Sequence, residues 1–177
     1  MGKTKGSTVL TPVKLLRGRR EEALSVLAPE LHHYLDERIV VASWYPEADV
    51  IGLVKACAAI LPIPGDIYET MGAAGAKGHL EGIYAHLLGR DLNARAHTLW
   101  KTQHDSGELA ISATTPDSAT YTLSGWDHAS REYCRLLGAY FVEVHRLDGA
   151  AEPSVVHPRC RASGADACVW TVRWRLP

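Results

Sequence analysis

The sequence has no long hydrophobic segment and no marked excess of charge of either sign. No apolar run approaches the ~20 residues that a helix needs to span a bilayer, and residues 1–7 are basic but lack the apolar segment of a signal peptide. The 19 Lys and Arg residues are balanced by 20 Asp and Glu, so the formal net charge is -1. This balance gives no general attraction to nucleic acid or to an anionic membrane. We therefore expect a cytoplasmic protein that binds neither.

Cysteine is also scarce, with four residues in a chain of 177. In a reducing compartment, so few cysteines are better candidates for metal binding than for disulfides. The length suits one well-buried domain and is short for two. Because no internal repeat or low-complexity linker divides the chain, we expect a flexible tail at 1–7 and a single domain over 8–177.

Helices are expected in the first part of the chain. Apolar residues at helical spacing predict helices over 19–35, 46–60, 66–88 and 92–100, and Pro29 should kink or split the first of them. The segment 8–16 reads as a strand or an extended lead-in. Four glycines, Gly72, Gly75, Gly78 and Gly82, fall in the third helix. They indicate close packing against another backbone or a space kept open for a ligand.

Strands are expected in the second part of the chain. Short strands are predicted over 108–114 and 119–123, joined by turn residues, and a hairpin over 153–177. Asp127 is expected to cap an intervening helix. Helices followed by strands with one inserted helix indicate an α+β domain, in which helices pack against an antiparallel sheet.

The clearest chemical pattern lies in the last third of the chain. Cys134 is followed by His157, by Cys160 three residues later and by Cys168 after seven more residues. Three thiolates and one imidazole are a common closed ligand set for tetrahedral zinc. The alternative is that these cysteines are buried apolar residues, which is how we interpret Cys57 on the apolar stripe of its helix.

This pattern resembles the end of the four-vinyl reductase type small-molecule-binding domain, which occurs in bacterial sensors of phenol-like aromatic compounds. The cysteines match that family's helix cysteine and Cys-x7-Cys hairpin, and Gly164 falls in the hairpin turn. His157 replaces an acidic ligand. The segments 44–47 and 68–72 look more like a family of standalone myxobacterial proteins of unassigned role.

The resemblance implies the fold shared by NO-signalling and Golgi-transport ligand-binding proteins, with the zinc-binding helix and hairpin at 124–177. It also implies a homodimer that binds a small apolar or aromatic ligand and acts through an unknown downstream protein. Four protein ligands would leave zinc no open position for water or substrate, so the ion would be structural and the protein not an enzyme.

A ligand pocket is expected between the glycine-rich helix, the 92–100 helix and the sheet, although its candidate residues could equally be ordinary core residues. The candidates are Tyr68, Met71, Tyr84, His86, Trp100, Tyr121 and Tyr140. His104, Asp105 and Ser106 are adjacent, so they cannot form a catalytic relay with one another, and we interpret them as a turn or cap. Two alternatives remain open: a protein–protein adaptor with a filled interior, and an accessory factor of tetrapyrrole metabolism.

Overall fold

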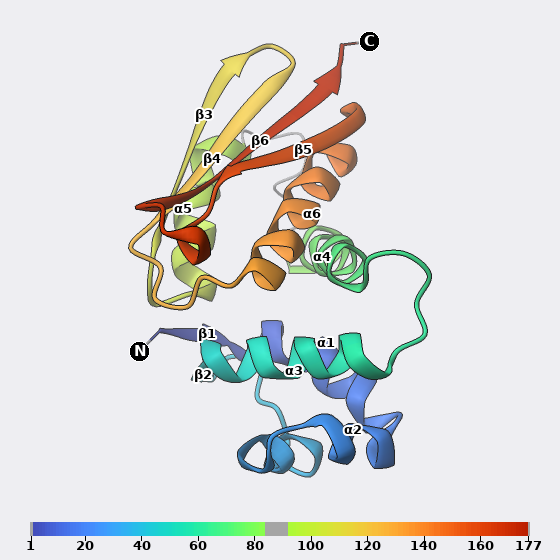
Figure 1. Cartoon of the computed structure of the whole chain (residues 1–177). Coiled ribbons are helices and arrows are strands. Elements are labelled where there is room, and N and C mark those ends of the chain that lie inside the picture. Colours follow the sequence, from blue (N-terminus) through green and yellow to red (C-terminus); the bar gives the residue numbers. More distant parts are fainter. Residues whose placement is uncertain (1, 84–91, 177) are drawn as a thin grey trace.

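The computed structural model describes residues 2–83 and 92–176, which form two lobes, one above the other in Figure 1. The helical lobe comprises residues 2–60. Its elements are β1 (Lys3–Lys5), α1 (Gly6–Arg17), α2 (Arg20–Val26), the 3-10 helix η1 (Pro29–Leu35), β2 (Trp44–Pro46) and α3 (Glu47–Ile60). β1 and β2 pair as a short antiparallel ribbon.

The beginning of the chain differs from the sequence-based expectation. Residues 3–5 form β1 where a flexible tail was expected, and residues 8–16 lie in α1 rather than in a strand. Val9, Val13 and Leu16 follow one another at helical spacing and are completely buried. This apolar stripe at positions i, i+4 and i+7 favours a helix over a strand in this segment. The split of the 19–35 helix at Pro29 is confirmed, because α2 ends at Val26 and η1 begins at Pro29.

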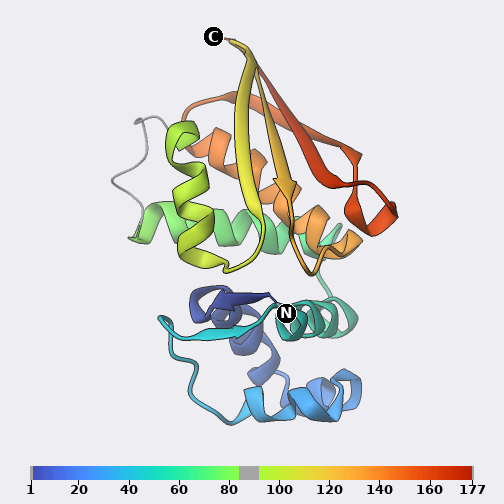
Figure 2. The same ribbon diagram turned by 90° about the vertical axis from the view of Figure 1, so that its left-hand side faces the viewer.

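The described part of the sheet lobe comprises residues 67–83 and 92–176. Its helices are α4 (Ile67–Gly78), the π-turn η2 (His79–Ile83), α5 (Leu92–Gln103), α6 (Arg131–Leu147) and the 3-10 turn η4 (Arg161–Ser163). Its strands are β3 (Glu108–Thr115), β4 (Ser118–Ser124), β5 (Ala151–Arg159) and β6 (Ala167–Arg175), paired antiparallel in the order β3-β4-β6-β5. The helices lie on one face of this sheet, as Figure 2 shows. The expected α+β class with an antiparallel sheet is confirmed.

Two helix boundaries in this lobe have clear local causes. The Asp66 side chain accepts hydrogen bonds from the backbone N–H groups of Tyr68 and Glu69, and so caps α4. α6 is capped by Ser130, which accepts from the N–H of Tyr133, and not by Asp127 as expected.

α4 packs directly across α6 because Gly72 allows their backbones to approach. A Cβ at Gly72 would lie 2.0 Å from the carbonyl oxygen of Leu136. Gly78, one and a half turns further on, would place its Cβ in open space. Close packing and free space, the two expected roles of these glycines, thus occur at different points of one helix.

Candidate ligand cavity and cysteine cluster

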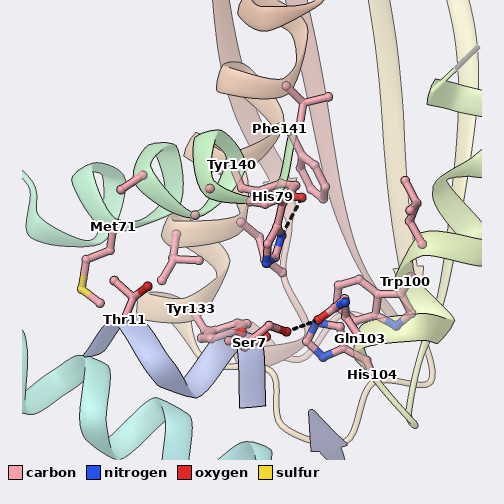
Figure 3. A pocket seen from close by; sticks show the side chains of 18 of the residues that line it. Ser7, Thr11, Met71, His79, Trp100, Gln103, His104, Tyr133, Tyr140 and Phe141 are labelled. Atoms are coloured by element: carbon pink, nitrogen blue, oxygen red, sulfur yellow. Dashed lines mark hydrogen bonds between the residues drawn. The ribbon is translucent and has the colours of Figure 1, made fainter. Parts of the chain in front are cut away.

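A cavity of about 410 Å³ lies between the helical lobe and the sheet lobe. Its wall is formed by α1 and α3 from one lobe and by α4, α5, α6 and the sheet from the other, and it is mostly apolar (Figure 3). No Asp, Glu, Lys or Arg is found among the described residues that line it. Such a space suits a small molecule whose surface is largely apolar.

Two histidines reach the cavity from the sheet lobe. His79 follows α4, and its Nδ1 lies 3.1 Å from the hydroxyl oxygen of Tyr140 on α6. Burial lowers the pKa of His79, and the nearby His104 lowers it further. His104 directly follows α5 and stacks flat on Trp100, with ring centroids 3.9 Å apart. Both imidazoles are therefore fixed in the cavity wall.

Glu47 holds His104 in place from the other lobe. This buried residue begins α3, and its Oε1 accepts a hydrogen bond from His104 Nδ1 at 2.6 Å. Its Oε2 accepts from Trp126 Nε1 at 2.9 Å and from the Ser106 hydroxyl at 3.2 Å. Three donors of the sheet lobe thus satisfy one buried carboxylate of the helical lobe, as a buried charge requires.

On the other side of the cavity, Tyr121 connects the wall with the end of α6. Its ring stacks on Phe141 at 4.0 Å, and its hydroxyl lies 2.8 Å from Nε2 of His145. Burial raises the pKa of Tyr121 and lowers that of His145. Both groups are therefore neutral near neutral pH, and the hydrogen bond satisfies them in a buried place.

The structure brings four of the seven candidate ligand residues to the cavity. Met71, Trp100, Tyr121 and Tyr140 line it. Tyr68 does not, because its ring lies beside the guanidinium of Arg135, 5.4 Å from the ring centroid. Tyr84 and His86 lie outside the described residues.

Three polar residues were not predicted from the sequence: His79 and His104 in the cavity wall, and Glu47, which holds His104 from outside that wall. His104 was interpreted as part of a turn or cap, and Glu47 was given no role beyond its place at the start of the predicted 46–60 helix. Glu47 and His104 are 57 residues apart, so no local pattern joins them. The available signal was a histidine that directly follows a predicted helix, which by itself fits a surface position equally well.

The four cysteine-cluster residues do meet. The ligand atoms of Cys134, His157, Cys160 and Cys168 all lie within 4.8 Å of one another. The Cys134 sulfur is 3.6 Å from that of Cys168 and 3.8 Å from that of Cys160. α6 supplies Cys134, β5 supplies His157, and Cys160 and Cys168 flank the turn between β5 and β6.

The thiols of this cluster differ in their tendency to ionise. A hydrogen bond from Cys134 lowers the pKa of Cys168, assisted by His157 and by the backbone N–H of Arg161. The pKa of Cys134 is raised in return, because it is the donor and is buried. His157 stacks on Trp170 at 4.6 Å, and its Nε2 is buried with no partner among the described residues. Cys57 lies apart in the core, where its thiol faces the carbonyl of Pro12.

No family profile matches the sequence, and no curated protein matches it. Solved structures do match. An H-NOX protein from S. oneidensis in the Fe(II)NO ligation state superimposes with a TM-score of 0.64 at 16% identity, covering 97% of this chain and 99% of that one. A mutant of an S. oneidensis H-NOX protein in the Fe(II) state gives 0.67 at 18% identity, covering 97% and 96%. An oxygen-binding H-NOX domain related to soluble guanylate cyclases gives 0.62 at 15% identity, covering 98% and 96%.

These matches correct two sequence-based expectations. The neighbours are H-NOX domains, so the resemblance to four-vinyl reductase type domains is wrong. The expected structural zinc is wrong with it, since the metal cofactor named for these neighbours is haem iron. The reason is that the resemblance rested on the spacing of three cysteines, and such a short local pattern does not determine the fold family of the whole chain.

One finding concerns the membrane: among the described residues, no helix is both long enough and apolar enough to cross a bilayer. At 15–18% identity, likeness to the three structures establishes the fold alone. The chain has the H-NOX fold over nearly its whole length.

Proposed function

We propose that this protein is a small-molecule-binding sensory domain, not an enzyme, and that its ligand occupies the cavity between the lobes. The cavity itself is the observation that carries this proposal. It has room for a small ligand, and the described wall is apolar with a few neutral polar groups. The ligand that fits such a wall is uncharged and largely apolar.

Both lobes contribute to the wall, so a bound ligand contacts both. A ligand that binds one arrangement of the lobes more tightly than another shifts the population toward it. The change would reach a partner protein, with the domain acting as a homodimer. The adaptor alternative had a filled interior as its premise, and the cavity counts against it.

Haem is the second candidate ligand, because solved neighbours of this fold carry it. Haem iron needs an axial ligand such as histidine, and His104 fits that need because Glu47 holds its other ring nitrogen, as is usual for metal-bound histidines. Haem also carries two carboxylates. No described lining residue offers a cation to them, so the described wall does not fit haem and suits an uncharged ligand better.

One titration tests the cavity. Indole is added to methyl-labelled protein, and the NMR shifts of Leu10, Met71 and Leu80 are followed. We expect saturable shifts in the wild type. Gly78→Leu places a side chain in the cavity and should weaken binding about tenfold or more, whereas Glu69→Leu on the exposed side of α4 should not.

Absorbance separates the two ligands. Protein produced with a haem precursor in the medium, or mixed with haemin, is expected to show no stoichiometric haem band. A band lost in His104→Ala would establish haem as the ligand and overturn the uncharged one. If indole shifts no cavity methyl group and haem does not bind, the sensory function itself fails.

We propose further that the protein binds one metal ion, with Cys134, His157, Cys160 and Cys168 as its ligands. Metal analysis would identify the ion. The observation that carries this proposal is that one ligand atom from each of the four residues converges within 4.8 Å. In addition, Nε2 of His157 is buried without a partner among the described residues. An ion there would join α6 to the β5–β6 hairpin.

Metal analysis of protein purified without a histidine tag tests this centre. We expect about one metal ion per chain, lost in Cys160→Ser and retained in Cys57→Ser, since Cys57 lies outside the cluster. A chelator should lower the melting temperature of the wild type and of Cys57→Ser only. Folded wild-type protein without metal would show that the cluster is a group of core thiols.

A further inference from the structure

We propose that His104 selects the ligand by presenting Nε2 to the cavity as a hydrogen-bond acceptor, so that the ligand is a flat, uncharged molecule carrying an N–H or O–H donor. The inference rests on the proposed ligand-binding function and adds the chemical class of the ligand. It starts from the way in which Glu47 holds the imidazole.

Glu47 fixes which nitrogen of His104 carries the proton. A carboxylate oxygen only accepts hydrogen bonds, so the 2.6 Å contact requires the hydrogen on Nδ1. In the neutral imidazole the other nitrogen then carries a lone pair. Nε2 has no partner among the described residues, and His104 lines the cavity. A donor on the ligand is the group that would satisfy this nitrogen.

Two contacts keep the ring in this orientation. His104 lies parallel to Trp100, with an interplanar angle of 12°, and Trp100 in turn donates its Nε1 hydrogen to the carbonyl of Ser106. Glu47 is itself fixed by Trp126 and Ser106. The acceptor is therefore preorganised, and a ligand does not have to order it on binding.

The remaining wall determines the frame of the ligand. Trp100 and the stacked pair Tyr121 and Phe141 present ring surfaces, and the described wall has no charged side chain. A cation would find no counter-charge there, because Glu47 already accepts three hydrogen bonds. A flat apolar frame with a neutral donor meets both conditions.

The decisive comparison uses indole and 1-methylindole, in which a methyl group replaces the hydrogen of the N–H donor. The wild type is expected to bind 1-methylindole about tenfold more weakly, because a buried hydrogen bond contributes about that factor. His104→Phe keeps a ring on Trp100 and removes the acceptor, so it should bind the two compounds equally. The two differences form a cycle that removes the effect of the added methyl group.

A second measurement needs no ligand. Nitrogen-15 chemical shifts of the imidazole report the tautomer, and we expect the Nδ1–H form of His104 in the wild type. Glu47→Gln should raise the Nε2–H population and reduce the preference for indole. A purely structural role of Glu47 would lower stability without moving the tautomer.

The possible results are distinct. Equal binding of indole and 1-methylindole by the wild type, or a predominantly Nε2–H tautomer, would overturn the role of His104 and leave the cavity intact. Absence of any cavity shift with either compound would overturn the ligand-binding function and the inference with it.

Discussion

The cavity and the cysteine cluster share α6, which supplies Cys134 to the cluster and residues between Tyr133 and Val144 to the cavity wall. The sequence predicted the cluster far more clearly than the cavity. The cluster uses four side chains of rare chemistry within 35 residues, and they converge as their spacing suggested. The cavity uses common apolar residues from eight elements, spread over more than 130 positions. The polar residue that holds its wall, Glu47, comes from a different lobe than the histidine it orients.

The comparison shows that a spacing can predict which ligand atoms meet without predicting the family to which the fold is similar. The spacing of the cysteines correctly brought the ligand atoms together, yet the family inferred from them was wrong. The cavity lies instead between the lobes, where the residue pattern carried only weak signals. A short cysteine motif reports local geometry, whereas the site shared by a fold depends on the whole chain.

The largest change in stability is expected from Glu47→Ala. It leaves His104, Trp126 and Ser106 without their buried acceptor, and should lower the free energy of unfolding by about 3–5 kcal/mol. Urea denaturation measures it. Glu69→Ala on the exposed face of α4 is the control and should change stability by less than about 0.5 kcal/mol. A small effect of Glu47→Ala would mean that the lobes do not depend on this contact.

A smaller effect is expected from the glycines of α4. Gly72→Ala places a methyl group 2.0 Å from the Leu136 carbonyl oxygen, so α4 and α6 must separate, at a cost of about 1–3 kcal/mol. Gly78→Ala meets no neighbouring atom and should stabilise the helix by up to about 1 kcal/mol. Thermal unfolding of both variants tests the distinction. The same sign of change in both would contradict the assigned packing.

The smallest effect is the pH dependence of stability. Burial lowers the pKa of His79 beside the cavity and of His145 behind Tyr121. Because the unfolded chain then binds protons more readily than the folded chain, this contribution is complete above about pH 6.5 and decreases as the pH falls toward the lowered folded pKa values. Denaturation between pH 8 and pH 5 measures the loss.

His145→Gln should flatten part of this pH dependence, since glutamine does not titrate and can still bond the Tyr121 hydroxyl. The pKa of Glu132 is lowered, mainly by a backbone hydrogen bond. Protonation of Glu132 therefore lowers the stability of the protein only at pH values below its ordinary pKa, a range separate from that of the histidines. An unchanged slope in His145→Gln would show that His145 is accessible to protons in the folded state.

Local sequence accounts for the secondary structure of most of the chain and for the approach of His157, Cys160 and Cys168 within one hairpin. Pro29 divides a helix, turn residues join β3 to β4, and alternation along β6 buries Cys168, Trp170 and Val172. These outcomes depend on neighbours within a few residues or on a single hairpin, where the physical causes lie inside the segment.

The contact between the two lobes and the set of residues that line their cavity depend on the tertiary structure. Gly72 serves close packing because α6 lies against it, whereas a Cβ at Gly78 would meet open space, although both glycines belong to one helix. Glu47 orients His104 because two distant helix ends come together. Such contacts join residues far apart in the chain, and their energies depend on burial and partners that no local pattern encodes.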